Sequence, residues 1–337
     1  MRVALVHDDL VQWGGAERVL EGICEIFPEA PIFTSVYDNS NKELYNRFGS
    51  KKIITSFLQK IPGWRNLYKT LMPFYPIAFE QFDFSDFDLV ISQTTRFAKS
   101  IITKPQTKHI CYCHTPPRFL WHFSGDKSPI LLEPLMSKLR IYDQISSKRV
   151  DFFIAGSKNA KIRIKDTYKQ DSRVVYPYID LERFNNIESF NSNYFVMIAR
   201  DSKYKKIDLA VSACQKLGVE LKVISGGFLD EMVVRILAGC RALIVPGIED
   251  FGLSAIEAQA LGKPVIALKA GGNLETVIDN KTGILFDKQD LESLSGAIKR
   301  LDSKKIKAED CKKNAQRFSK ENFQRAFKQT IAAVVYT

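Results

Sequence analysis

Two glutamates, Glu249 and Glu257, stand on either side of a turn that contains Gly252. The apolar run at 241–245 predicts a buried strand before the turn, and 254–261 predicts a helix after it. The N-terminus of a helix presents unpaired backbone N–H groups and the positive end of its dipole, which together favour an anion such as phosphate. Carboxylates on either side would suit hydroxyl-rich groups. An ordinary α/β turn with two solvated glutamates has the same pattern, so the pattern alone leaves both interpretations open.

A second group of candidate residues lies in the first half of the chain. Gly14 and Gly15 follow a predicted strand and open a predicted helix, so their backbone N–H groups can approach a ligand unobstructed by side chains. His114 ends another predicted strand, 108–114, and precedes two prolines. Open α/β sheets bind ligands at the carboxyl ends of their strands, which makes His114 a candidate site residue. A plain tight turn and a structural histidine are the alternatives.

A metal site is the third chemistry that the sequence raises. His109, Cys111 and Cys113 alternate, so on a strand their side chains would share one face, and a zinc site is conceivable. No fourth ligand stands at a suitable spacing, and buried strand cysteines are common. The six cysteines show no repeating spacing, which predicts reduced thiols rather than a disulfide framework. We therefore expect no metal ion.

Length and charge limit the class of protein. The 337 residues are enough for two domains of ordinary size. No run of about 18 apolar residues occurs and the first apolar segment is too short for a signal peptide, so we expect a cytoplasmic protein. The net charge of +11 indicates an acidic partner: nucleic acid, an anionic membrane or a phosphorylated substrate. Basic residues are spread through both halves and no nucleic-acid-binding motif appears, so nucleic acid is the weakest of the three.

The segment 51–72 interleaves basic and aromatic residues. Its basic residues are Lys51, Lys52, Lys60, Arg65 and Lys69, and its aromatic residues include Phe57, Trp64 and Tyr68. This composition suits peripheral contact with an anionic membrane. The alternative is a set of helices packed on the first domain with solvated lysines.

The residues around the two glutamates resemble the signature of family 4 retaining glycosyltransferases. The chain reads EDFGL from Glu249 and EAQALGKPVIA from Glu257. Segments 14–17, 111–121, 200–210, 270–277 and 282–286 also resemble this family, so the likeness runs nearly end to end. The motif around His114 is similar to that of bacterial mannosyltransferases of polysaccharide and O-antigen synthesis.

The resemblance implies an α/β fold of the GT-B type, with two Rossmann-like domains facing across a cleft and a nucleotide sugar held mainly by the second. The expected domains are 1–177 and 178–317, followed by a helix at 318–337 that crosses back to the first domain. We expect the sheet of the first domain to end with a strand at 151–157.

The activity that the resemblance implies is the retaining transfer of a hexose to a glycan or lipid-linked glycan in cell-surface polysaccharide synthesis. GDP-mannose is the favoured donor and a UDP-sugar is next. No metal or other cofactor is then required. A sugar-nucleotide epimerase on the same fold and a catalytically idle partner of another glycosyltransferase are the alternatives.

The resemblance also implies roles for particular residues. Glu249 would contact the transferred hexose, His114 would lie beside it, and Glu257 would bind the ribose hydroxyls. Arg200 and Lys205 match the pair that holds the diphosphate, although without the resemblance they are only part of a basic loop. The other expected donor-binding residues are Gly14, Gly15, Asp250, Phe251, Gly252 and Leu253. Arg96 and Arg118 are candidates on the acceptor side.

The chain departs from the family after 223–227. Such enzymes usually have an extra helix and strand there, ending in a loop beside the nucleobase, whereas 228–240 leaves room for one helix only. We therefore expect a second domain that is shortened by one strand and has lost much of the wall that contacts the base.

Overall fold

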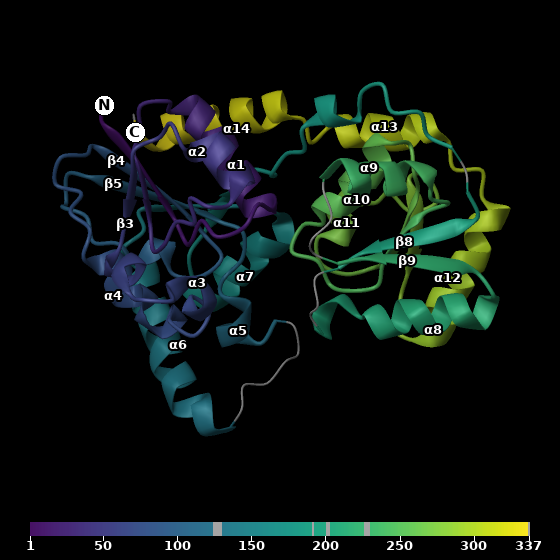
Figure 1. Ribbon diagram of the computed structural model, residues 1–337, viewed down its shortest axis with the longest axis horizontal. Coiled ribbons are helices and arrows are strands. Elements are labelled where there is room, and N and C mark those ends of the chain that lie inside the picture. Colours follow the sequence, from purple (N-terminus) through teal and green to yellow (C-terminus); the bar gives the residue numbers. More distant parts are fainter. Residues whose placement is uncertain (124–129, 191, 200–202, 226–229, 336–337) are drawn as a thin grey trace. The chain divides into compact units, whose positions relative to one another are not determined.

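A computed structural model describes residues 1–123, 130–190, 192–199, 203–225 and 230–335 of the chain. These residues form two compact units (Figure 1). The first unit contains 1–123, 130–176 and 324–335, and the second contains the described residues of 177–323. Arg200, one of the predicted site residues, lies outside the described residues.

The first unit is built on a seven-stranded parallel sheet in the order β3-β2-β1-β4-β5-β6-β7. Its strands are β1 (Val3–His7), β2 (Ile32–Thr34), β3 (Ile53–Thr55), β4 (Leu89–Thr94), β5 (Lys108–Cys113), β6 (Phe152–Ala155) and β7 (Ser172–Val174). The central strands β1, β4 and β5 are buried on both faces, because their burial does not alternate along the strand and only the first residue of β1 and of β5 is not buried. Because the strands are parallel, their carboxyl ends meet at one edge of the sheet, and the loops that follow them carry polar residues.

The helices of the first unit are α1 (Gly15–Ile26), α2 (Lys42–Phe48), α3 (Trp64–Leu67), α4 (Tyr75–Glu80), α5 (Arg118–Trp121), α6 (Glu133–Ser147) and α7 (Lys158–Tyr168). The last helix of the chain, α14 (Lys320–Val335), belongs to this unit from Gln324 onward. There Gln324 donates to Glu25 of α1 at 2.8 Å, and Phe327 packs on Tyr112 of β5. In Figure 1, α1 and α14 lie above the sheet and α4 to α6 lie below it.

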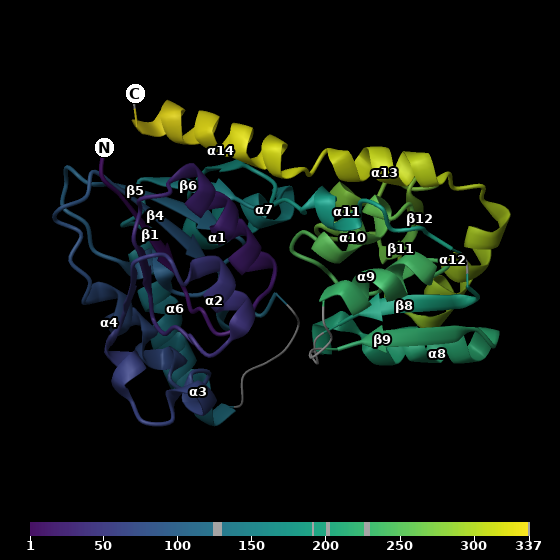
Figure 2. The same ribbon diagram turned by 45° about the horizontal axis from the view of Figure 1, so that its top comes forward.

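The second unit contains a five-stranded parallel sheet in the order β12-β11-β10-β8-β9. Its strands are β8 (Tyr194–Ile198), β9 (Glu220–Ile224), β10 (Leu243–Val245), β11 (Val265–Leu268) and β12 (Gly283–Phe286). Its helices are α8 (Ile207–Leu217), α9 (Asp230–Gly239), α10 (Leu253–Ala260), α11 (Asn273–Thr276), α12 (Leu291–Ser303) and α13 (Ala308–Gln316). Helices α8 and α12 share one hydrophobic core with the sheet, and α9, α10 and α13 lie toward its other face (Figure 2). Among the described residues between β9 and β10, α9 is the only element.

The prediction that 151–157 forms the last strand of the first sheet is wrong, because β7 pairs beyond it with β6. β7 has three residues and only one of them is buried, so it carries almost no hydrophobic pattern of its own. Its place in the sheet depends on the ladder with β6, which is a tertiary contact.

The basic and aromatic segment 51–72 is packed on the first unit through most of its aromatic residues. Trp64 is 6% exposed and Tyr68 is half-buried. Both contact the hydrophobic core that α4 and α6 share with the sheet. Leu67 and Phe57 are exposed, as are Lys52, Lys60 and Lys69. No helix of the described residues is long and apolar enough to cross a membrane.

Candidate active site

The loop between β10 and α10 positions Glu249. Its backbone carbonyl accepts the N–H of Gly272 at 2.8 Å, which ties the loop to the chain after β11. A side chain at Gly247 would meet the carbonyl oxygen of Tyr204 at 2.5 Å. Gly252 caps α10 with φ of 99°, a conformation that favours glycine. The Glu249–Gly272 hydrogen bond, the close contact of Gly247 with Tyr204 and the Gly252 cap together fix the direction in which the loop leaves the sheet.

Lys205 and Glu249, both predicted from sequence, meet in the second unit. The Lys205 ammonium donates to Glu249 Oε1 at 2.6 Å, and the two side chains are only 16% and 11% exposed. Lys205 ends a short 3₁₀ turn (Lys203–Lys205) that comes before α8. The pair places a cation and a carboxylate in the loop region that leads to the N-terminus of α10. Such a pair can contact an anion and a hydroxyl side by side.

Glu257, in the middle of α10, pairs with an arginine that the sequence analysis did not single out. Arg183 Nη1 lies 3.4 Å from Glu257 Oε1, and its Nη2 lies 2.5 Å from Asp230 Oδ2 at the start of α9. Arg183 and Asp230 also line a cavity of about 460 Å³ with Glu231 and Arg235. Nothing near Arg183 in sequence marks it, because it is one of 49 basic residues and its partners are far along the chain.

The remaining residues of the signature divide into two kinds. Leu253 begins α10 and Gly252 caps it, so both belong to the N-terminus of the helix. The ring of Phe251 is buried and packs edge-on against Phe318 at a centroid distance of 5.3 Å. Any contact of Phe251 with a donor would therefore come from its backbone. Asp250, which stands between Glu249 and Phe251, is half-buried.

In the first unit, Gly14 and His114 follow the carboxyl ends of β1 and β5. Gly14 is the N-cap of α1 in an extended conformation, and Gly15 is its first residue. His114 is half-buried, and burial lowers its pKa to about 3, so the ring is neutral at physiological pH. Gln93 at the end of β4 lies 2.7 Å from His114 Nε2.

A buried carboxylate holds the loop that carries Arg96. Asp8, directly after β1, accepts hydrogen bonds from four consecutive backbone N–H groups, those of residues 95–98, at 2.6 to 2.9 Å. Arg96 itself forms an ion pair with the buried Asp9. This candidate for the acceptor side is therefore also part of the packing of its own loop.

A second buried pair joins the same loop to the helix that begins with Arg118. Lys99 and Asp143, both without solvent exposure, form an ion pair, and Asp143 Oδ2 accepts from Trp121 Nε1 at 2.8 Å. Trp121 is the last residue of α5 and Arg118 is the first. The loops with Arg96 and Arg118 are thus held together through α6.

The histidine and the cysteines of β5 are buried in the first unit, where His109 is hydrogen-bonded to neighbouring residues. His109 Nε2 lies 2.8 Å from the Ser92 hydroxyl and Nδ1 lies 3.2 Å from the Arg149 carbonyl, so both ring nitrogens have partners. Burial lowers the pKa of His109 to about 4 and raises that of the Cys111 thiol to about 12. Within the residues that the structure describes, no group of three or more His, Cys, Asp or Glu is arranged to hold a metal ion.

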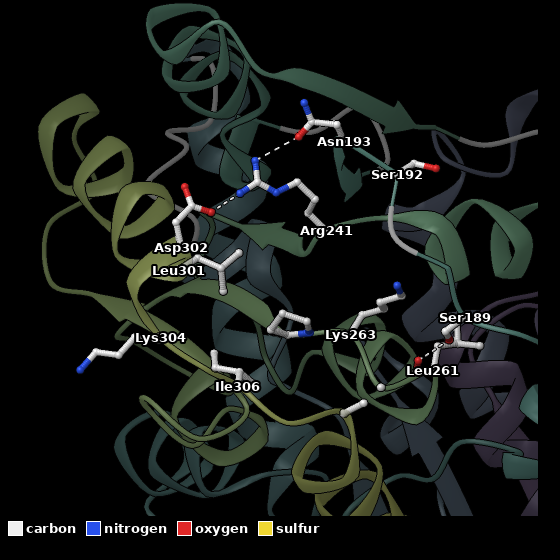
Figure 3. A pocket seen from close by; sticks show the side chains of 13 residues that line it. Ser189, Ser192, Asn193, Arg241, Leu261, Lys263, Leu301, Asp302, Lys304 and Ile306 are labelled. Carbon is white, nitrogen blue, oxygen red and sulfur yellow. Dashed lines mark hydrogen bonds and ion pairs between the residues drawn. The ribbon is translucent and has the colours of Figure 1, made fainter.

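A cavity of about 530 Å³ lies elsewhere in the second unit (Figure 3). Arg241 and Lys263, which line it, come just before β10 and β11, whereas Glu249 follows the other end of β10. Arg241 pairs with Asp302, and Lys263 donates to the Phe190 carbonyl at 2.7 Å. The cavity is therefore at the amino edge of the sheet, away from the loops that bind ligands in such folds.

Comparison with known proteins decides the family. The model described as Glycosyltransferase Family 4 matches residues 13–183, which are 171 of the 337 residues and more than half of the chain. The chain belongs to glycosyltransferase family 4. A second model, Glycosyl transferases group 1, matches residues 214–318 of this glycosyltransferase, the part that holds Glu249 and Glu257.

Two relatives of this family 4 glycosyltransferase share about a quarter of its residues over the aligned parts. It is 26% identical over 208 residues to an uncharacterized glycosyltransferase of Methanocaldococcus jannaschii, an alignment that covers 55% of this chain and 59% of that protein. It is 23% identical over 369 residues to the alpha-1,3/1,6-mannosyltransferase ALG2 of Kluyveromyces lactis, with 82% of this chain and 71% of the relative covered.

Solved structures show the fold. The sucrose-phosphate synthase of Thermosynechococcus elongatus superimposes with a TM-score of 0.73 at 17% identity, over 99% of this glycosyltransferase and 100% of that chain. HepE of Anabaena, crystallised with UDP, gives 0.69 at 17% identity with the same coverage. The glycosyltransferase thus has the GT-B fold, in which each parallel sheet belongs to one Rossmann-like domain, as predicted from the sequence.

Proposed function

We propose that this family 4 glycosyltransferase transfers a hexose, with retention of configuration, from a nucleoside diphosphate sugar to a glycan or lipid-linked glycan. The observation that carries the proposal is the 2.6 Å pair of Lys205 and Glu249 in the region that leads to the N-terminus of α10. A cation and helix-end amides suit the leaving diphosphate, and a carboxylate suits hydroxyls of the hexose.

The chemistry that we propose depends on charge. As the bond between sugar and phosphate breaks, negative charge grows on the diphosphate, so fixed donors bind it more strongly in the transition state than in the ground state. Lys205, Arg200 and the amides at Gly252 and Leu253 would supply those donors without a metal ion. The diphosphate oxygen would accept the proton of the acceptor hydroxyl as that hydroxyl attacks from the same face.

Binding roles follow for the other residues. Glu257, oriented by Arg183 at 3.4 Å, would accept hydrogen bonds from the ribose hydroxyls. Asp250 and the backbone of Phe251 would complete the donor site, together with Gly14, Gly15 and His114. Arg96 and Arg118 would lie on the acceptor side. In this proposal the donor domain is 178–317, the acceptor domain is 1–177, and 318–337 is a C-terminal helix that crosses back to the first domain.

The donor and the cellular setting are argued from the relatives. The Kluyveromyces lactis protein is a mannosyltransferase by name, which supports mannose and hence GDP-mannose. The Anabaena structure contains UDP, which keeps a UDP-sugar as the second choice. Polysaccharide synthesis on the inner face of the cell membrane would bring the basic segment 51–69 to an anionic lipid surface.

A donor assay tests the proposal. Purified protein is incubated with GDP-[¹⁴C]mannose or labelled UDP-glucose, with and without a lipid-linked glycan, and the products are separated. We expect label in the glycan only when acceptor is present, with an α-linkage from an α-linked donor. Label in a changed nucleotide sugar without acceptor would indicate an epimerase. No movement of label with any donor, together with no nucleotide binding, would indicate an idle partner and contradict the proposal.

A further inference from the structure

Four polar side chains, three of them buried, form a chain of contacts across the carboxyl edge of the first sheet. Gln93 of β4 lies between His7 of β1 and His114 after β5, with Oε1 at 3.1 Å from His7 Nδ1 and Nε2 at 2.7 Å from His114 Nε2. Gln93 Nε2 also donates to the Ala16 carbonyl in α1 at 2.6 Å. His7 Nε2 in turn lies 3.6 Å from Glu17 Oε1. His7, Glu17 and Gln93 are each under 5% exposed.

The partners of Gln93 fix which atom of its amide is nitrogen. The Ala16 carbonyl can only accept a hydrogen bond, so the amide nitrogen must face it, and the amide oxygen then faces His7 Nδ1. The same nitrogen faces His114 Nε2. An N–H on that ring nitrogen would oppose the amide N–H, so His114 Nε2 must accept and carry no proton. The neutral ring then holds its proton on Nδ1.

The surroundings keep His114 neutral. Burial lowers its pKa to about 3, and the nearby His7 acts in the same direction while Asp8 opposes both. The Tyr112 ring of β5 packs edge-on against it at 5.0 Å, and Glu17 faces His7 rather than His114. Among the residues that the structure describes, no hydrogen-bond partner is found for His114 Nδ1. The ring thus presents one neutral donor that the protein itself does not use.

We propose that Gln93 is a positioning residue that locks His114 as the neutral Nδ1–H tautomer, so that His114 donates one hydrogen bond to a hydroxyl oxygen of the sugar. The inference rests on the proposed function for the identity of that ligand. It means that His114 is a fixed donor and takes no part in proton transfer. A hydroxyl suits such a site because it can accept this bond, whereas a protonated amino group could not.

The tautomer can be observed directly because the chain contains only four histidines. Long-range ¹H–¹⁵N spectra of ¹⁵N-histidine-labelled full-length protein distinguish Nδ1–H from Nε2–H rings, and His114→Asn assigns the signal by its loss. We expect the Nδ1–H pattern for His114, unchanged between about pH 5 and pH 8. An Nε2–H pattern, or a titration near the ordinary histidine range, would overturn the inference.

Two variants separate positioning from packing. Gln93→Glu replaces the amide donor by an acceptor, so His114 should take a proton on Nε2, its pKa should rise and the turnover should become dependent on pH. Gln93→Met removes the donor with little change in volume, and kcat/KM should fall roughly tenfold as the tautomer is no longer fixed. The control is Gln59→Met, because within the described residues the Gln59 amide bonds only to the backbone of Tyr37. Its His114 signals should match wild type.

The outcomes distinguish this inference from the proposed function. If the spectra show the Nδ1–H tautomer and no sugar is transferred, the proposed function fails while the tautomer lock stands, and sugar as its ligand is lost. If sugar is transferred and Gln93→Met leaves both the spectra and kcat/KM unchanged, the inference fails alone. Should Gln93→Glu not fold, the wild-type spectra and Gln93→Met still decide the matter.

Discussion

Lys205 and Glu249 meet although 44 positions separate them in the chain. If Lys205 stabilises the leaving diphosphate, Lys205→Ala should lower kcat by about 100- to 1000-fold, which corresponds to roughly 2.7–4 kcal/mol. Glu249→Ala should be similarly severe, and the double variant should lose less than the sum because the residues act together. Glu257→Ala should cost less, since ribose contacts change little during the reaction. Steady-state kinetics with the donor found active in the assay above measure these effects.

A matched control exists on the same domain. Lys216 forms an ion pair with Glu292, and both side chains are exposed, so Lys216→Ala should leave kcat unchanged. Wild-type turnover in Lys205→Ala would remove its assignment to the diphosphate.

His109 should make stability depend on pH. Its pKa falls to about 4 in the folded protein because the ring is fully buried, whereas the unfolded chain takes up a proton near the ordinary value. Below that value the unfolded state binds more protons, so the free energy of unfolding falls as the pH is lowered. From about pH 7.5 to 5.5, wild type should lose roughly 1 kcal/mol more of its free energy of unfolding than His109→Gln. Urea unfolding at both pH values measures the difference. Equal losses in the two proteins would contradict the prediction.

At the scale of elements, the loop after β4 depends on one carboxylate. Asp8 accepts the backbone N–H groups of residues 95–98, and the amide of Asp8→Asn would place its own donors against some of them. Buried donors without acceptors are costly, so we expect Asp8→Asn to lower the free energy of unfolding by roughly 3 kcal/mol. Asp83→Asn, at an exposed carboxylate, should have a much smaller effect in the same urea titration. Equal effects would mean that Asp8 is not the anchor of the loop.

The segment 51–69 should attract anionic lipid if the enzyme works at a membrane. Each exposed lysine near the surface contributes about 1 kcal/mol, and the attraction is screened by salt. Sedimentation with phosphatidylserine vesicles should therefore fall sharply in high salt and in a variant with Lys51, Lys52, Lys60 and Lys69 changed to Gln. The control changes four exposed lysines of the second unit: Lys299, Lys304, Lys305 and Lys313. Equal pelleting of the two variants would exclude this segment as the contact.

At the scale of the whole molecule, the predicted shortening of the second domain bears on the choice of nucleotide. α9 is the only described element between β9 and β10. If the wall beside the base is reduced as predicted, a wrong base would leave few buried hydrogen-bonding groups unpaired, and each such group would cost about 1–3 kcal/mol. GDP and UDP should then bind within about tenfold of each other, or about 1.4 kcal/mol. Calorimetry with both nucleotides tests this. A preference well above a hundredfold would show that other residues, such as those of the cavity beside Arg183, have rebuilt the base pocket.

The short-range features of this protein could be predicted from its sequence. The strand, glycine-containing turn and helix around Glu249 and Glu257 follow from neighbouring residues, because hydrophobic periodicity and turn signals act within a few positions. The resemblance of the same segment to family 4 then predicted the two-domain fold. Lys205 was predicted as a site residue from the resemblance too, since its own neighbours in the sequence indicate only a basic loop.

The tertiary structure decided which partners the candidate site residues contact. Arg183 reaches Glu257 across 74 positions, Gln93 reaches His7 across 86, and Trp64 turns into the core although its segment has the composition of a membrane contact. No local pattern encodes these contacts. Which strands end side by side is set by the order of the whole sheet, and only that order brings His7, Gln93 and His114 together. The sequence by itself therefore determined most of the elements and the family, whereas β7 and the way in which each site residue is held were decided by the packing of distant segments, because buried polar groups must find their partners wherever the fold puts them.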